Sequence, residues 1–176
     1  MNLRLKRTPG IYVVGFMGSG KSTIGRLLAH RLGWSFFDID EEIEAAEKSS
    51  ITAIFETRGE PEFRRIETEI LRQHVAWVER GRPAVLALGG GAFSAAENRR
   101  IVENNGLSIW LDCPLDVVSR RVAPESHRPL ARDPERFAEL YKTRLETYRL
   151  ADIRIPITSD DASVAVEQIL KRAEFA

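Results

Sequence analysis

The segment "GFMGSGKST" at residues 15–23 limits the possible folds more than any other feature of this sequence. It matches the pattern G-x-x-x-x-G-K-[ST] at Gly15, Gly20, Lys21 and Ser22. An apolar run at residues 11–14 precedes it, within a first strand that we expect at residues 11–16, and a helical pattern follows at residues 21–32. Strand, loop and helix in that order are the context that a phosphate-binding loop requires, so the segment predicts a nucleoside triphosphate site at the edge of a parallel sheet.

Each residue type in the loop has a physical role. Glycines such as Gly18 and Gly20 permit backbone angles and close approaches that a Cβ would block, so that successive N–H groups can converge on phosphate oxygens. Lys21 supplies a mobile ammonium for the terminal phosphates, and the Ser22 hydroxyl can ligate Mg²⁺. The alternative is a flexible glycine turn with a solvated Lys21. The agreement between motif and context argues against it.

The rest of the chain alternates short apolar runs with longer segments of helical period, which is typical of an α/β fold with a parallel sheet. We expect further strands at residues 35–40, 84–88, 107–112 and 152–157, the last at an edge because Pro156 cannot donate to a ladder. We expect helices at residues 21–32, in two pieces between 41 and 59, then at 61–80, 95–105, from 114, at 134–151 and at 162–174. Residues 123–133 have no periodicity and are interpreted as a mobile surface loop.

Composition narrows the class of protein. The 176 residues carry 26 basic and 26 acidic side chains, so the chain reads as one domain without a polyanionic partner such as a nucleic acid. No run approaches the roughly 18 apolar residues that cross a membrane. The basic start and short apolar run at residues 1–14 only faintly imitate a secretory signal, and Cys113 is the single cysteine. We therefore expect a soluble cytoplasmic protein.

Two carboxylates follow the second predicted strand. Asp38 and Asp40 are two residues apart, so in extended chain they would point the same way, toward the carboxyl edge of the sheet. There they could hold Mg²⁺ water and accept a proton from an attacking hydroxyl. Alternatively Asp38 caps the next helix, with Glu41 completing a capping box.

Two arginines fall on apolar helix faces. Arg64 aligns with Leu71 and Val75 at turn spacing, and Arg144 lies within the stripe that begins at Phe137. A guanidinium on a packed face needs a carboxylate or a ligand, or must reach back to water. Internal pairing explains one such arginine well, whereas two in a small domain favour an anionic ligand.

Three further features lie near the same sheet edge. The glycines at residues 89–91 follow the third strand and either bring backbone close to a substrate or form a tight turn. Arg128 lies in the predicted surface loop, and Arg121 lies just before it. Both can be solvated charges, but a closing loop that carries a cation also stabilises phosphoryl transfer and excludes water.

As a set, these residues resemble the shikimate kinase family. The resemblance rests on "GFMGSGKSTIGRLLAHRLG", "FFDIDEEIE", "IFETRGEPEFRRIE", "LALGGGA", "RPL" and the spacing of Arg144 and Tyr148, all in family order. It implies a single P-loop kinase domain over residues 1–176, similar to nucleoside monophosphate kinases, with a three-layer architecture. The five-stranded parallel sheet would have the order 2-3-1-4-5 and helices on both faces, with a lid at about 123–133 and a substrate-binding region at about 38–67.

The resemblance also implies a reaction and roles for residues. ATP would phosphorylate the 3-hydroxyl of shikimate, in the route to chorismate and aromatic amino acids, in a monomeric enzyme that uses Mg²⁺. Shikimate would be bound by Asp40, Arg64, Gly90 and Arg144. The ATP phosphates would be bound by Gly18, Ser19, Gly20, Lys21, Ser22 and Thr23. Mg²⁺ would be bound by Ser22 directly and by Asp38 through water. Asp40 would be the base, Arg121 would lie against adenine, and the lid residue Arg128 would join Lys21 at the ATP phosphates.

The sequence departs from the family pattern in places, and rival functions exist. Ala131 follows Arg128-Pro129-Leu130 where a second leucine is common, Thr147 stands where many members have proline, and residues 159–161 match too loosely to assign. The nearest rivals are a gluconate kinase of the same architecture and a nucleoside monophosphate kinase. A GTPase switch is disfavoured because the sequence lacks an N-K-x-D segment.

Overall fold

Apolar runs form the strands, and their burial follows from their place in the sheet. The computed structural model describes residues 10–123 and 133–172. Its five parallel strands are β1 (Gly10–Val14), β2 (Ser35–Asp38), β3 (Ala84–Ala87), β4 (Leu107–Asp112) and β5 (Ile153–Pro156). Their order, β2-β3-β1-β4-β5, confirms the predicted topology. Central β1 is buried throughout, because helices cover both faces of a parallel sheet.

The edge strand β5 shows the opposite pattern. Ile153 and Ile155 are buried, whereas Arg154 and Pro156 are exposed. Alternation of this kind indicates a strand with one face on the core. Pro156 is tolerated because an edge strand has unpaired backbone groups on one side.

The helices follow the predicted punctuation. Their bounds are α2 (Lys21–Leu32), α3 (Ile39–Glu47), α4 (Ile51–Arg58), α5 (Glu60–Glu79), α6 (Ala96–Asn105), α7 (Leu115–Val122), α8 (Pro134–Tyr148) and α9 (Ala162–Leu170). Gly33 ends α2 in the left-handed region, with φ of 67°. The Asp133 carboxylate caps α8 by accepting from the backbone N–H of Arg136.

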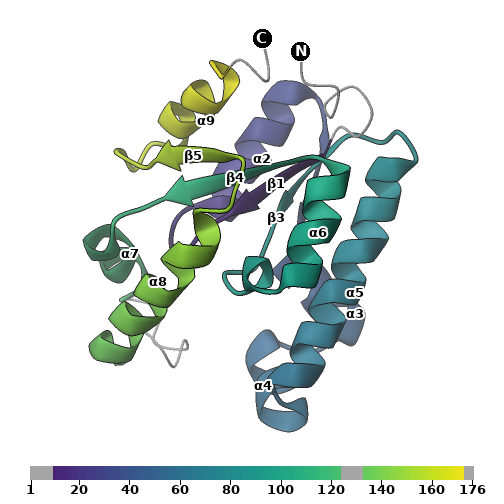
Figure 1. The fold of residues 1–176 in the computed structure, drawn as a ribbon, viewed down its shortest axis with the longest axis vertical. Coiled ribbons are helices and arrows are strands. Elements are labelled where there is room, and N and C mark those ends of the chain that lie inside the picture. The colour runs from purple at the N-terminus through teal and green to yellow at the C-terminus, as the bar shows by residue number, and fades with distance from the viewer. Residues whose placement is uncertain (1–9, 124–132, 173–176) are drawn as a thin grey trace.

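The helices form two layers around the sheet (Figure 1). Helices α2 and α9 pack together on one face, and α5 and α6 pack together against the other. Helices α4 and α8 extend past the carboxyl ends of the strands (Figure 1). Those strand ends therefore face a region bordered by helices, which is where ligands of open α/β sheets bind.

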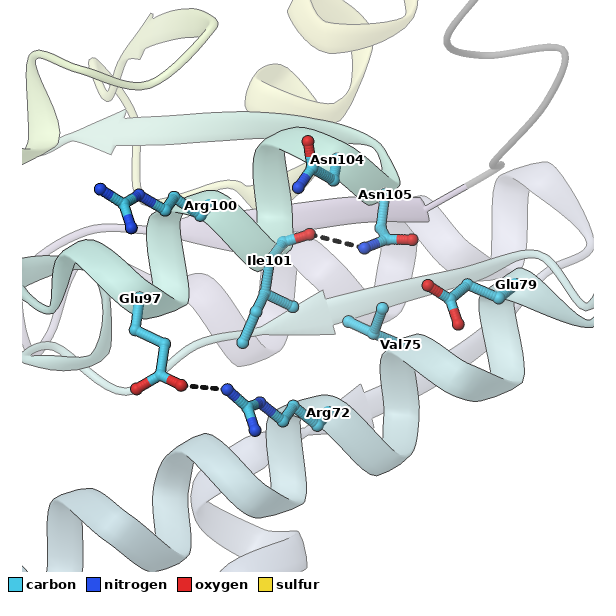
Figure 2. Close-up of a pocket in the computed structure, with 8 residues that line it drawn as sticks. All are labelled: Arg72, Val75, Glu79, Glu97, Arg100, Ile101, Asn104 and Asn105. Atoms are coloured by element: carbon cyan, nitrogen blue, oxygen red, sulfur yellow. Dashed lines mark hydrogen bonds and ion pairs between the residues drawn. The ribbon is translucent and has the colours of Figure 1, made fainter.

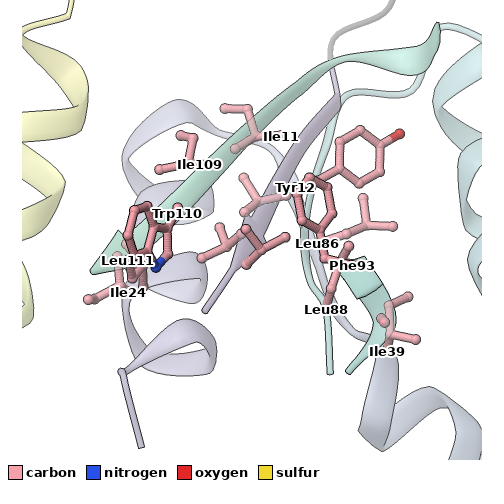
Figure 3. Packing of buried hydrophobic residues seen from close by; sticks show 14 of the residues in the cluster. Ile11, Tyr12, Ile24, Ile39, Leu86, Leu88, Phe93, Ile109, Trp110 and Leu111 are labelled. Carbon is pink, nitrogen blue, oxygen red and sulfur yellow. The ribbon is translucent and has the colours of Figure 1, made fainter. Parts of the chain in front are cut away.

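A continuous apolar core joins the layers (Figure 3). It includes Ile11 and Tyr12 from β1, Leu86 from β3, and Ile109 and Leu111 from β4, all fully buried. Among the described residues, none of the helices is both long and apolar enough to cross a bilayer.

Several element boundaries differ from the prediction, among them the end of β2, which lies at Asp38 rather than at residue 40. Strand β1 ends at Val14 rather than residue 16, because Gly15 turns away with φ of 152°. Helices α8 and α9 end at Tyr148 and Leu170, earlier than the sequence pattern suggested. Of the predicted loop at residues 123–133, residues 124–132 lie outside the described part of the chain.

Candidate active site

The phosphate loop has the geometry that its glycines predict. Gly18 and Gly20 adopt φ of 79° and 95°, in the left-handed region that side chains rarely occupy. A Cβ on Gly18 would lie 2.9 Å from a methyl of Val122, so α7 packs closely against the loop. No side chain of the described residues caps the first turn of α2, which starts at Lys21. Its N–H groups therefore point toward the loop, as in an anion-binding helix start.

Lys21 and Ser19 are held by the loop itself. The Lys21 Nζ donates to the carbonyl of Phe16 at 3.0 Å, and the backbone N–H of Ser19 donates to the same carbonyl at 3.1 Å. The Ser19 side chain is fully buried beneath the loop. The ammonium thus lies across the loop, where it can meet the terminal phosphates of a bound nucleotide.

The positions of Asp38 and Asp40 correct the sequence interpretation. The extended chain ends at Asp38, which caps α3, and Asp40 already lies in the first turn of that helix. One carboxylate oxygen of Asp38 accepts from the backbone N–H groups of Asp40 (3.0 Å) and Glu41 (3.3 Å). The alternative role of Asp38 as a helix cap is therefore confirmed, whereas the capping box with Glu41 stays a prediction. The two carboxylates do not point together along a strand.

The second oxygen of Asp38 faces the phosphate loop. The Ser22 hydroxyl at the start of α2 donates to this oxygen, which brings two predicted magnesium ligands into direct contact. A hydroxyl and a carboxylate are hard oxygen donors of the kind that Mg²⁺ prefers, and Mg²⁺ in kinase sites takes few protein ligands beside phosphates and water. Within the described residues, no cluster of three His, Cys, Asp or Glu side chains offers a closed metal cage. The residues present thus fit a nucleotide-associated Mg²⁺.

Arg64 and Arg144 converge on one point. A Cβ built on Gly91 would collide with guanidinium nitrogens of both residues, so the two cations lie together over this glycine. Burial lowers the pKa of the Arg144 guanidinium, and the nearby charge of Arg64 acts in the same direction. Arginine stays charged nonetheless. Two adjacent, partly desolvated guanidinium groups from α5 and α8 form a fork for a carboxylate.

Backbone of the glycine loop fixes Arg144. Its guanidinium donates to the carbonyl of Gly90 at 3.1 Å and to the hydroxyl of Ser94 at 3.2 Å. The buried Tyr148, one turn later on α8, also donates to the Gly90 carbonyl, at 2.5 Å. The glycines at 89–91 therefore do form a turn, closed by the bond from the Ala92 N–H to the Gly89 carbonyl at 3.0 Å. The same turn is a backbone platform for Arg144 and Tyr148, and we call it the glycine platform.

Glu67 is a site residue that the sequence analysis missed. Its side chain is 1% exposed, and one oxygen accepts from Arg64 at 2.8 Å. Burial raises the pKa of the Glu67 carboxyl, the charge of Arg64 opposes that rise, and Asp40 adds to it. A Cβ on Gly89 would lie 2.7 Å from an Asp40 oxygen and 3.1 Å from the other Glu67 oxygen. The signal was a carboxylate within the apolar stripe of α5, three residues after Arg64.

Arg121 borders a second hollow beside the phosphate loop. One nitrogen donates to the Gly18 carbonyl at 3.0 Å, and another pairs with Asp160 at 2.8 Å. A cavity of about 290 Å³ lies here, lined by Gly18, Gly20, Thr23, Ile24, Arg121, Ile157, Ser159, Asp160 and Ala162. Ser159 and Asp160, from the segment left unassigned by sequence, thus lie opposite Arg121 in this cavity.

A larger hollow lies elsewhere. About 430 Å³ in volume, it runs between α5 and α6, and its lining residues include Arg72, Glu79, Glu97 and Arg100 (Figure 2). Arg72 and Glu97 form an ion pair across it (Figure 2). None of the predicted site residues within the described part of the chain lines this hollow.

Known proteins resemble this chain over most of its length. The family model for shikimate kinase matches residues 17–174. The chain belongs to the shikimate kinase family. A shikimate kinase of Persephonella marina is 41% identical over 163 residues, which cover 92% of this chain and 97% of the relative. One of Cereibacter sphaeroides is 41% identical over 176 residues, covering 98% and 83%.

A solved structure of the family extends the comparison to three dimensions. The shikimate kinase of Acinetobacter baumannii, solved in complex with shikimate, has a TM-score of 0.86 and 36% identity, covering 95% of this chain and 93% of that one. Membership of the shikimate kinase family identifies the chain as an ATP-dependent small-molecule kinase. The rival families considered from sequence are thereby set aside.

The predicted residues thus fall into two groups. Asp40, Arg64, Gly90 and Arg144 meet around the 89–91 loop, and the phosphate loop meets Asp38 and Arg121 beside it. Arg128 lies outside the described residues, so its predicted role stays a prediction.

Proposed function

We propose that this kinase transfers the γ-phosphoryl group of ATP to the 3-hydroxyl of shikimate. The convergence of Arg64 and Arg144 over Gly91, beside the phosphate loop, carries the proposal. A compact acceptor with a single carboxylate matches this fork, because a guanidinium binds a carboxylate through paired N–H donors. An acceptor without a carboxylate, such as a neutral sugar, would leave two neighbouring cations unpaired in a partly desolvated pocket.

Asp40 is positioned to act on the acceptor hydroxyl. It lies in the first turn of α3 beside the glycine platform, so an acceptor held by its carboxylate would extend past Asp40 toward the phosphate loop. The hydroxyl oxygen attacks the γ-phosphorus, the bond from that phosphorus to the bridging oxygen of ADP breaks, and the hydroxyl proton passes to the Asp40 carboxylate. Most of the rate enhancement should come from in-line positioning and from the cations around the phosphates.

The other residues hold the nucleotide. The N–H groups of residues 18–23 and the Lys21 ammonium would bind its phosphates, and Arg121 with the 159–160 segment would enclose its base. Ser22 and Asp38 would hold Mg²⁺, which neutralises phosphate charge when it is bound. The proposal also includes a lid at about 123–133 that carries Arg128, and a substrate-binding region at 38–67. The enzyme would be a monomeric, cytoplasmic protein of one domain.

A coupled assay of ADP release tests the function. The purified protein receives Mg·ATP with shikimate, gluconate, AMP, CMP or no acceptor. We expect strong stimulation by shikimate alone, and phosphate on the 3-oxygen of the product. Preference for another acceptor would refute the substrate assignment while leaving the phosphate loop intact. Lys21→Ala, which removes the ammonium at the phosphates, is the inactive control.

A further inference from the structure

Glu67 has one carboxyl oxygen that accepts no hydrogen bond from the part of the chain that the structure describes. The carboxyl is buried within α5, its first oxygen accepts from Arg64, and its second finds no hydrogen-bond partner among the described residues. A buried acceptor without a partner is costly, and such a group in a native fold calls for an explanation. Protonation would convert that oxygen into a donor and remove the buried charge.

The groups that face Glu67 come from three helices and the glycine platform. Arg64 on α5 pairs with it, Asp40 on α3 opposes it with a like charge, and Arg144 on α8 adds a weaker attraction. A Cβ built on Gly89 would lie 3.1 Å from the second Glu67 oxygen and 2.7 Å from an Asp40 oxygen. They are therefore no more than about 6 Å apart, within the range where like charges oppose each other.

A substrate carboxylate on Arg64 and Arg144 would change this balance in one direction. It would share the N–H donors of Arg64 and neutralise the charge that favours the ionised form of Glu67. It would also add a third carboxylate to the cluster and exclude water from it. Burial already raises the pKa of Glu67, with Arg64 as the main opposing influence. Each change therefore favours the neutral carboxylic acid.

We propose that Glu67 takes up a proton from solvent when the carboxylate of the acceptor substrate binds Arg64 and Arg144. The proton adds to the oxygen that lacks a partner, and the neutral acid can then donate toward the Asp40 carboxylate. Glu67 keeps its first oxygen on Arg64 throughout. The inference rests on the proposed substrate, and it makes shikimate binding a proton-linked event with Glu67 as a positioning residue.

Thermodynamic linkage between proton binding at Glu67 and shikimate binding fixes how shikimate affinity depends on pH. Because substrate raises the pKa of Glu67 above its value in the free enzyme, affinity is highest below the free-enzyme pKa. Affinity falls by up to about tenfold per pH unit between the two pKa values and becomes constant above the higher one. Over that interval, binding takes up as much as about one proton per shikimate.

Calorimetry tests this directly on the full-length protein. Shikimate is titrated into wild-type enzyme, without nucleotide, in buffers of different ionisation enthalpy and at several pH values. The slope of observed enthalpy against buffer ionisation enthalpy counts the protons exchanged. We expect net uptake in the wild type. Binding without any buffer dependence at every pH would overturn the proton-uptake proposal, whereas no binding of shikimate at all would instead refute the proposed substrate.

Two matched variants assign the proton. Glu67→Gln keeps an acceptor for Arg64 and supplies N–H donors toward Asp40, so it should bind shikimate with no proton uptake and little pH dependence. Glu60→Gln changes the other carboxylate that accepts from Arg64, at 3.4 Å, but this side chain is 62% exposed. That variant should retain the uptake. Uptake that persists in Glu67→Gln, or that disappears in Glu60→Gln alone, would contradict the assignment.

A measurement on the wild type covers the case in which Glu67→Gln fails to fold. Infrared difference spectra with and without shikimate, on protein with isotopically labelled glutamate carboxyl groups, should show a new protonated-acid carbonyl band. The absence of that band when the site is saturated would overturn the proposal.

Discussion

Helix α5 carries two arginines with opposite surroundings. Arg72, near the middle of the helix, pairs with Glu97 across the hollow between α5 and α6, where the two side chains are 58% and 59% exposed. Arg64, about two turns earlier, is 28% exposed. It donates to the buried carboxylate of Glu67 and lies against the guanidinium of Arg144. The larger hollow thus holds an exposed ion pair, whereas the glycine platform gathers like charges from separate helices.

The binding site is thus marked by charged side chains that converge from separate helices, rather than by the size of a hollow. An exposed ion pair in water contributes little, because solvent screens it and ordering two long side chains opposes it. Two cations forced together near a buried carboxylate are costly unless an anion joins them. The fold keeps that arrangement through the hydrogen bonds of Arg144 to Gly90 and Ser94. Four substitutions test the contrast.

The largest effect should follow removal of a guanidinium from the platform. Arg144→Ala should weaken shikimate binding by about 2 to 5 kcal/mol and change ATP binding far less, because it removes an ionic contact from a desolvated site. Calorimetric Kd values for both ligands measure this. Arg149→Ala, at the C-cap of the same helix and exposed in a pair with Glu146, is the control and should leave both constants unchanged. Equal losses for the two ligands would contradict the assigned role.

A change of shape at constant charge should have the next largest effect. Arg64→Lys keeps the cation but loses the planar fork, so shikimate affinity should fall by about 1.5 to 3 kcal/mol. Arg72→Lys is the same substitution on the same helix and should leave the Kd for shikimate unchanged. If the two variants behaved alike, the contrast between platform and hollow would be lost.

Adding one methyl group should disturb the platform from below. Gly91 has φ of −99°, so alanine fits its backbone, but the Cβ would occupy the place of the Arg64 and Arg144 nitrogens. Gly91→Ala should cost about 1 to 3 kcal/mol of shikimate affinity, because crowding displaces both guanidinium groups. Fluorescence or calorimetric titration with shikimate and with ATP tests this. An unchanged Kd for shikimate would show that the fork tolerates displacement.

The smallest effect belongs to the hollow between α5 and α6. Arg72→Ala should change the free energy of unfolding by less than about 1 kcal/mol and leave turnover unaffected, because the pair with Glu97 is solvent-exposed. Chemical denaturation and the ADP-release assay measure the two quantities. A large loss of activity would instead link this hollow to the active site.

Local patterns were sufficient for much of the fold. The order of strands and helices, the phosphate loop, the stop at Gly33 and the cap at Asp133 follow from short-range rules about glycine angles, hydrophobic period and capping. The inward-facing arginines Arg64 and Arg144 were also predictable, because a charge within an apolar stripe needs a partner. Asp40 was misplaced because the end of β2 and the start of α3 compete for the same residues, and the cap at Asp38 favours the helix.

By itself, then, the sequence determined a nucleotide-binding α/β kinase and the residue types at its site, since these depend on neighbours within a few positions along the chain. Only the tertiary structure decided which groups meet. Segments distant in sequence meet at four places: Ser22 pairs with Asp38, the arginine fork lies over Gly91, the buried Glu67 lies beside Asp40, and residues 159–160 lie opposite Arg121. Packing of α3, α5 and α8 at one sheet edge sets those distances, and no local pattern encodes them.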